Sequence, residues 1–194
     1  MSRLRVRLRA MRPIPLPDPP LTDGEILLRP WERRDVPAMT AACQDPEIPR
    51  WTVVPHNYTE RHARDFISHS AGDRQAGREI ALAVVDGADR VLGALGMSNF
   101  DWSDRKGEIG YWMAPEARRR GVGARATRML AEWAVTGLGL ERVELLANPQ
   151  NEPSQRLAER AGFEREGVLR RYRRRHGVRE DLVMYSLLAE DLGR

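Results

Sequence analysis

The sequence contains one cysteine and no long apolar run, and each shortage excludes a class of protein. Cys43 is the only thiol among 194 residues. A disulfide framework and a cysteine zinc site are therefore both excluded, and a reducing cytoplasm is the expected compartment. The longest run without charge, Val91 to Phe100, is about half of the ~20 apolar residues that a membrane-spanning helix needs. We expect no membrane partner.

Histidine is also scarce, with four residues in the chain. His62, Asp65 and His69 share one face of an expected helix. Two histidines seven residues apart with one carboxylate are a poor set of zinc ligands. We therefore predict no metal site. With 41% hydrophobic and 31% charged residues, the composition is that of a globular domain.

Positive charge is concentrated at the N-terminus rather than spread over the chain. The formal net charge is +4, and residues 1–13 hold five arginines and no acid. Without those five (Arg3, Arg5, Arg7, Arg9 and Arg12), the chain has 27 basic and 28 acidic residues. A body so close to neutral lacks the basic footprint of a nucleic-acid-binding domain, so nucleic acid is not the expected partner.

The N-terminal residues 1–22 are interpreted as an arginine- and proline-rich arm, and residues 23–194 as one domain. Five prolines between positions 13 and 20 remove backbone donors and favour an extended conformation. Arginine recurs every second or third residue of the arm, which excludes the apolar stretch of a secretory signal. Translation could begin at Met1 or at Met11. The arm alone suggests one alternative function, association with RNA or the ribosome through its basic residues.

Beyond the arm, the spacing of apolar residues predicts an α+β order of elements. The runs Glu79–Val85, Val91–Phe100 and Gly107–Met113 are predicted to form an antiparallel meander. After Pro115, apolar residues recur at helical spacing from Val122 to Ala134. The other expected elements are the strand Glu25–Pro30, the helix Asp35–Gln44, the loop Asp45–Tyr58, the helix Thr59–Ala71, the strand Arg142–Leu146, the helix Asn151–Ala161 and the hairpin Phe163–Arg175 with Val178–Leu188.

A glycine-rich loop precedes the amphipathic helix and reads Arg118-Arg119-Arg120-Gly121-Val122-Gly123-Ala124. Glycines without a Cβ let backbone N–H groups approach an anion at the positive end of a helix. The loop also matches part of a dinucleotide-binding pattern. However, seven residues separate Met113 from Gly121 where a Rossmann turn is tight, and the preceding strands form a meander. Taken alone, the loop fits a phosphate site or a solvated charge run at a helix start.

Two motifs in this order give the sequence a family resemblance. The first is Arg118-x-x-Gly121-x-Gly123, and the second runs from Asn151 and Ser154 to Gly162-Phe163. Together they resemble the GNAT superfamily of acetyl-CoA-dependent N-acetyltransferases, in particular its ribosomal-protein alanine and serine branch, over about residues 25–192. The resemblance implies an α+β, sandwich-like GNAT fold. Its central sheet is twisted, mixed and mostly antiparallel, is flanked by helices, and splays between the fourth and fifth strands.

The resemblance also implies how acetyl-CoA binds, without a metal. The pantetheine arm would pair along the fourth strand near Met113 like an added strand. Backbone N–H groups of the glycine loop would hold the pyrophosphate, and Arg118 or Arg156 further phosphate oxygens. Asn151 would reach the cofactor's amide, and it is also the expected N-cap of the helix that follows. The predicted cofactor-binding residues are Met113, Arg118, Arg119, Arg120, Gly121, Val122, Gly123, Ala124, Asn151, Ser154 and Arg156.

The implied reaction is attack of a neutral amine on a thioester carbonyl, so the amine must lose a proton and the thiolate must gain one. Glu108 is the candidate base, acting through a water. Its alternative role is a structural ion pair with Arg105 or Lys106. Many family members place a tyrosine acid four residues before the Gly-Phe pair, where this chain has Ala158. Ser154 is the candidate acid, with a structural first-turn serine as the alternative.

The acceptor amine stays open between a protein N-terminus and a small molecule. Trp51, His56 and Tyr58 are candidates to line its pocket, unless they pack onto the core. Tyr172 is a further candidate and lies among arginines, since residues 163–179 hold seven arginines and two glutamates. Such a cluster suits RNA, an acidic acceptor or a solvated hairpin face. A non-catalytic acyl-CoA-binding module is a second alternative function, and a homodimer is the oligomer considered.

Overall fold

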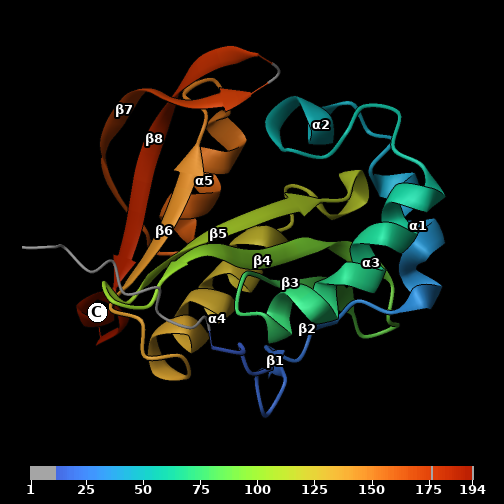
Figure 1. Cartoon of the computed structure of the whole chain (residues 1–194), viewed down its shortest axis with the longest axis horizontal. Coiled ribbons are helices and arrows are strands. Elements are labelled where there is room, and N and C mark those ends of the chain that lie inside the picture. The colour runs from blue at the N-terminus through green and yellow to red at the C-terminus, as the bar shows by residue number, and fades with distance from the viewer. Residues whose placement is uncertain (1–11, 176, 194) are drawn as a thin grey trace, which may run out of the picture.

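Eight strands form one sheet in the order β1-β2-β3-β4-β5-β6-β8-β7 (Figure 1). The computed structural model describes residues 12–175 and 177–193. Neighbouring strands are antiparallel except β5 and β6, which run parallel. The predicted mixed, mostly antiparallel sheet is therefore confirmed. The strands are β1 (Leu21–Thr22), β2 (Ile26–Pro30), β3 (Ile80–Asp86), β4 (Val91–Asp101), β5 (Lys106–Met113), β6 (Arg142–Ala147), β7 (Glu164–Arg175) and β8 (Val178–Leu188).

Helices cover both faces of the sheet (Figure 1). Along β3, Leu82 and Val84 belong to one apolar core, whereas Ala83 and Val85 belong to the other, because successive strand residues point to opposite faces. The first core is shared with α4 and α5 and the second with α1 and α3. These helices are α1 (Val36–Ala42), α3 (Glu60–Gln75), α4 (Val122–Thr136) and α5 (Glu152–Arg160).

The segment predicted as a loop between Asp45 and Tyr58 contains a short helix, α2 (Glu47–Trp51). The loop prediction is wrong over these five residues, because Pro46 and Pro49 do not interrupt the helix. Both lie at the start of the helix, where a missing N–H would have no partner in any case. The Asp45 carboxylate accepts a bond of 2.9 Å from the backbone N–H of Glu47, which supports this start.

A buried ion pair joins β2 to the start of α1. Both carboxylate oxygens of Asp35 accept bonds from the Arg29 guanidinium, at 2.7 and 2.9 Å, and the side chain of Asp35 is 4% exposed. Asp35 also accepts the backbone N–H of Glu32, and Arg29 reaches Asp89 at 2.8 Å. Burial alone would raise the pKa of Asp35, but the bonds from Arg29 and from the Glu32 N–H, together with the nearby positive charges, outweigh it and hold this pKa below its usual value.

Residues 12–22, which the sequence assigned to an arm, pack against the domain. Ile14 is fully buried and exchanges bonds with Arg74 at the end of α3. The guanidinium of Arg12 lies 4.2 Å from the ring centroid of Trp102, and β1 pairs with β2. This part of the predicted arm therefore contributes to the core. Arg3, Arg5, Arg7 and Arg9, on which the alternative RNA function rests, lie outside the described residues.

The one parallel pair opens partway along its length. β5 and β6 are in register only from Lys106 opposite Arg142 to Ile109 opposite Leu145. β5 then continues from Gly110 to Met113, paired only with β4. The predicted splay is confirmed. It was expected between the fourth and fifth strands, which are β5 and β6 in the structure because the short strand β1 was not predicted. None of the helices formed by the described residues combines the length and apolarity that crossing a bilayer requires.

Candidate active site

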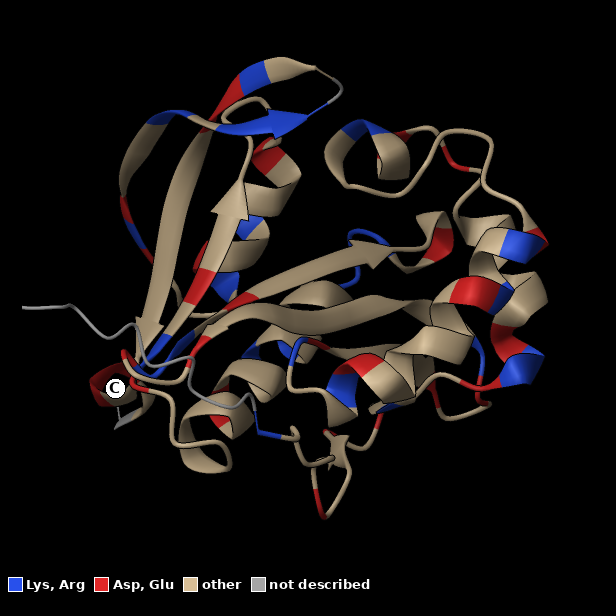
Figure 2. Cartoon of the chain, viewed as in Figure 1, with Lys and Arg blue, Asp and Glu red and all other residues tan. Residues whose placement is uncertain are grey.

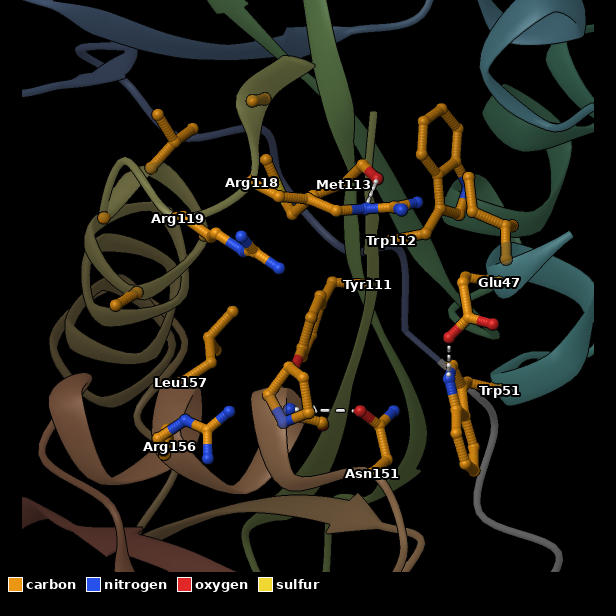
Figure 3. Close-up of a pocket in the computed structure, with 18 of the residues that line it drawn as sticks. Glu47, Trp51, Tyr111, Trp112, Met113, Arg118, Arg119, Asn151, Arg156 and Leu157 are labelled. Carbon is orange, nitrogen blue, oxygen red and sulfur yellow. Dashed lines mark hydrogen bonds between the residues drawn. The ribbon is translucent and has the colours of Figure 1, made fainter. Parts of the chain in front are cut away.

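The opening between β5 and β6 leads into a cavity of about 440 Å³. The end of β5 forms its floor, and the first turns of α4 and α5 and the short helix α2 surround it (Figure 3). In Figure 3, Arg119 and Arg156 lie on one side of the cavity, and Glu47 and Trp51 on the other. The cavity thus has an arginine end near α4 and α5 and a carboxylate and aromatic end at α2.

The arginine end of the cavity is built around the start of α4. Gly121 is the N-cap with φ of +75°, and a Cβ there would meet no atom within 4 Å. The first helical N–H groups, those of Val122, Gly123 and Ala124, have no intrahelical acceptor. They lie at the positive end of the helix dipole. All four residues line the cavity, so this end has the shape and polarity of an anion cradle, as the predicted pyrophosphate site requires.

Gly123 also has a packing role. A Cβ at this position would come within 2.5 Å of Leu157 Cδ1 on α5 and 3.3 Å of Met113 Cγ. The glycine therefore lets α4 approach α5 closely. A bulky residue at position 123 would disturb this packing together with the cavity, so Ala124 is the better position for a binding test.

Arg118 is already engaged by the protein's own groups. Its guanidinium donates to the Met113 carbonyl at 3.1 Å and to both carboxylate oxygens of Asp45, at 3.1 and 3.2 Å. Burial would raise the pKa of Asp45, but the bonds from Arg118 and from the backbone N–H groups of Glu47 and Ile48 together outweigh this and lower it. Arg118 thus ties the end of β5 to the turn before α2. Arg156 is exposed and pairs with Glu152 at 2.9 Å, and it lines the cavity together with Arg119 and Arg160.

The start of α5 brings Asn151, Ser154 and Tyr111 together. The Asn151 side chain accepts the backbone N–H of Ser154 at 3.2 Å, so the predicted N-cap is confirmed. The Tyr111 hydroxyl donates to Ser154 Oγ at 2.7 Å. Burial raises the pKa of Tyr111 to about 12 although its bond to Ser154 acts in the opposite direction. The phenol therefore stays protonated at neutral pH.

Tyr111 is a residue that the sequence analysis missed as a candidate. It lies 43 positions before Ser154 in the chain and on a different element. Tyr111 follows Ile109, the last β5 residue in register with β6, so its neighbour across the sheet opening is α5 rather than β6. This placement gives the cavity a phenol, although Ala158 stands where many relatives carry their tyrosine.

Glu108 lies outside the cavity lining and within the paired part of β5. Its carboxylate accepts bonds of 2.8 Å from Arg173 and from Asn99, and the side chain is 15% exposed. The expected alternative, an ion pair, is present, but the partner is Arg173 on β7. Arg105 pairs instead with Glu141, and Lys106 with Glu144.

The α2 end of the cavity carries Glu47 and Trp51. The Trp51 indole N–H donates to Glu47 Oε2 at 2.9 Å and Arg50 donates to Oε1 at 3.0 Å (Figure 3). These bonds, from Trp51 first and then Arg50, hold the pKa of Glu47 below its usual value. Among the described residues that line the cavity, Glu47 is the one carboxylate. The sequence analysis noted the aromatic residues of this segment and overlooked the acid.

The other acceptor candidates lie away from the cavity lining. Tyr58 is 6% exposed and packs in the core, with its hydroxyl 3.4 Å from Met39 Sδ, the packing role that the sequence also allowed. Burial raises its pKa to about 12. His56 is exposed in the segment before α3, and Tyr172 is 51% exposed on β7. Of the aromatic candidates, Trp51 alone lines the cavity.

Metal ligands do not gather in the described part of the chain, where no group of three or more His, Cys, Asp or Glu could hold an ion. The cavity does suit acetyl-CoA. It combines an unpaired strand edge for an amide-containing arm with a helix start and nearby arginines for phosphates.

Comparison with known proteins agrees with this geometry. The family model of the acetyltransferase (GNAT) domain matches residues 25–164. The chain belongs to the GNAT acetyltransferase family. The chain is also 29% identical to the uncharacterised N-acetyltransferase p20 of Bacillus licheniformis over 169 residues, which cover 86% of this chain and 94% of the relative. The match to a named N-acetyltransferase over nearly the whole length indicates that this GNAT protein is an N-acetyltransferase.

Two further matches concern the ribosomal branch of the GNAT family. YdaF of Bacillus subtilis (strain 168), named as a candidate ribosomal N-acetyltransferase, is 40% identical over 101 residues, 52% of this chain and 55% of the relative. The structure of RimL, a ribosomal L7/L12 α-N-protein acetyltransferase solved with coenzyme A, has a TM-score of 0.78 at 18% identity. It covers 89% of this chain and 98% of its own. At this identity the RimL match shows the GNAT fold alone.

Proposed function

We propose that this GNAT protein transfers the acetyl group of acetyl-CoA to a primary amine, by direct attack within a ternary complex in the cytoplasm. The observation that carries the proposal is the cavity where β5 leaves β6, which the first turn of α4 and the Tyr111–Ser154 pair both reach. A thioester and an amine held there together would be in the right geometry to react. The acceptor is the α-amine of a protein N-terminus or the amine of a small molecule.

The donor side of the proposal rests on backbone groups. In it, the pantetheine arm pairs along Gly110–Met113, the part of β5 that has no strand partner on the β6 side. The pyrophosphate lies at the free N–H groups of Val122 to Ala124. Arg119, in the loop before α4, and Arg156, on α5, supply positive charge (Figure 3).

Proton transfer is assigned to Ser154, with Tyr111 as its positioning residue. The amine nitrogen attacks the thioester carbonyl carbon, the carbon–sulfur bond breaks, and the sulfur must gain a proton. Ser154 Oγ accepts a hydrogen bond from the Tyr111 hydroxyl, which leaves the serine's own hydroxyl hydrogen free to point at the sulfur. The α-amine, with pKa about 8, needs only modest help to lose its proton, and Glu108 stays the candidate base through a water.

Replacing Ala124 with glutamate tests the phosphate site. Glutamate is favourable at the third position of a helix, so the fold is expected to persist. Its charge, beside the proposed position of the pyrophosphate, should cost about 2 kcal/mol, equivalent to a roughly thirtyfold weaker Kd for acetyl-CoA. Calorimetric titration measures this Kd.

The matched control for this test is Ala124→Gln, which has the same shape without the charge. It should bind acetyl-CoA within about threefold of the original protein, since glutamine removes only the repulsive charge. Equal affinity of the glutamate and glutamine variants for acetyl-CoA would contradict the placement of the pyrophosphate at α4.

The base hypothesis makes a separate prediction for Glu108→Gln. If Glu108 accepts the amine proton through a water, the variant should lose about tenfold in turnover below pH 7, where the amine is mostly protonated, and less above pH 8. Acetyl-CoA affinity should stay unchanged. Glu144→Gln, a similarly shielded carboxylate on β6, is the control. A pH–rate profile of the same shape in all three proteins would show that Glu108 is structural.

A further inference from the structure

Most arginines in the part of the chain that the structure describes form ion pairs with carboxylates. Several of the arginines without an ion pair are clustered in two places. Within residues 12–175 and 177–193, Arg119 and Arg160 have no ion pair and line the cavity, where the proposed cofactor carries its phosphates, and Arg120 follows Arg119 in the chain. Arg12, Arg33, Arg74 and Arg165 also have no ion pair and lie elsewhere in the fold. A second group lies on the hairpin of β7 and β8 and has no such explanation. The charged residues are coloured in Figure 2. This second group, the hairpin arginines, comprises Arg170, Arg171, Arg174 and Arg179.

The hairpin arginines are exposed, so their guanidinium groups can bind a ligand that approaches from solvent. Among the described residues, the hydrogen bonds of the Arg174 and Arg179 side chains go to backbone carbonyls, of Gly177 and of Arg171 and Tyr172 respectively. By contrast, their neighbours Arg173 and Arg175 are paired with Glu108 and Glu180. The hairpin therefore uses two arginines for its own attachment and presents the others to solvent.

The same hairpin borders the acceptor end of the cavity. Arg175 donates a hydrogen bond to the Arg50 carbonyl on α2, and the end of β7 lies beside α2 in Figure 1. Arg50 stacks on Trp51, 4.6 Å from its ring centroid, and Trp51 lines the cavity with Glu47. A chain leaving the cavity past α2 would therefore pass directly over the hairpin.

We infer that the acceptor is the amino terminus of a polypeptide whose next residues are acidic, and that the hairpin arginines bind those residues. This inference rests on the proposed acetyl transfer and narrows its acceptor. The α-ammonium group would enter beside Glu47, the carboxylate of the cavity lining. Carboxylates a few residues downstream would meet the guanidinium groups, which suit them as bidentate donors.

Several features favour an acidic peptide over RNA on this surface. The hairpin arginines adjoin Glu180 and Asp181, which would repel a continuous phosphate backbone, whereas separate carboxylates can bind between them. The exposed side chains beside them include Val178 at 65% and Tyr172 at 51%, which suit the apolar parts of a peptide. The body outside residues 1–13 is close to neutral, unlike a nucleic-acid-binding domain.

The test compares acetylation of two peptides that share their first two residues. One has glutamate at positions three to eight and the other glutamine at the same positions. We expect kcat/KM for the acidic peptide to be about tenfold higher at low salt, as three or four solvent-exposed ion pairs would give. This preference should shrink as salt is added. In Arg171→Gln/Arg174→Gln it should fall at least threefold, while acetylation of a small amine without a tail is unchanged.

The matched control is Arg61→Gln/Arg64→Gln, which removes the same charge from the exposed face of α3 and should keep the full preference. Equal kcat/KM for the two peptides in the unaltered protein would overturn the inference. A labelled single-stranded RNA that binds the unaltered protein but not the hairpin variant, without any peptide preference, would also overturn it and assign the hairpin to RNA. The small-amine assay tests the proposed function separately. A protein that acetylates no amine at all would contradict the proposed function itself.

Discussion

Ser154→Ala is expected to lower kcat about a hundredfold while leaving acetyl-CoA affinity within twofold, the range found when a positioned proton donor is removed. Alanine keeps the backbone N–H that donates to Asn151, so the start of α5 should persist. Only the hydroxyl between Tyr111 and the cavity is lost. Steady-state kinetics with a saturating amine, together with calorimetry for acetyl-CoA, measure the two quantities.

Tyr111→Phe separates positioning from direct proton donation in the same site. Phenylalanine fills the same volume but cannot donate to Ser154 Oγ, so kcat should fall about tenfold, less than in Ser154→Ala. In the double variant the two effects should not add, because the phenol acts only through the serine. A kcat in Ser154→Ala within twofold of the original would show that water protonates the thiolate.

Asp35→Ala is expected to reduce the free energy of unfolding by about 3–5 kcal/mol, the cost typical of removing one partner from a buried ion pair. Arg29 would keep Asp89 and the Pro30 carbonyl but lose its two bonds to Asp35. The connection between β2 and α1 would lose its buried anchor. Urea denaturation followed by circular dichroism measures the change.

The same carboxylate predicts the direction of acid destabilisation. Because the pKa of Asp35 is lower in the folded than in the unfolded chain, the contribution of Asp35 to the free energy of unfolding is complete above about pH 4. It is lost as the pH falls through the folded pKa.

Asp65→Ala is the control for Asp35→Ala, since Asp65 lies on the surface 3.8 Å from Arg61, and it should reduce the free energy of unfolding by about 0.5 kcal/mol or less. A cost below about 1 kcal/mol for Asp35→Ala would show that Arg29 is fully compensated by its other partners.

The regular elements and the start of α4 that lines the cavity were predictable from the sequence because their signals are local. The helical spacing of Val122 to Ala134 and the glycines before it specify α4 and its exposed N–H groups. Asn151 followed by Glu152-Pro153 specifies the N-cap of α5. Each of these features depends on residues within a few positions of one another, where the physics of helix starts applies directly.

The features that the sequence did not reveal depend on contacts between distant residues. The Tyr111 bond to Ser154 requires β5 to part from β6, and no local pattern marks that point. The bonds of Arg118 to Asp45 and of Glu108 to Arg173 span 73 and 65 positions. Ile14 was assigned to the arm because prolines surround it, yet it is buried against α3.

The free edge of β5 connects the stability of the folded protein to the ligand that pairs with this edge. From Gly110 to Met113 the strand has hydrogen-bonding groups without a strand partner on the β6 side, and such an edge can recruit any extended chain. A ligand that occupies it stabilises only the folded form, by about 2.7 kcal/mol when present at a hundred times its Kd. If acetyl-CoA pairs there as proposed, its concentration would set the stability of the folded enzyme as well as its rate.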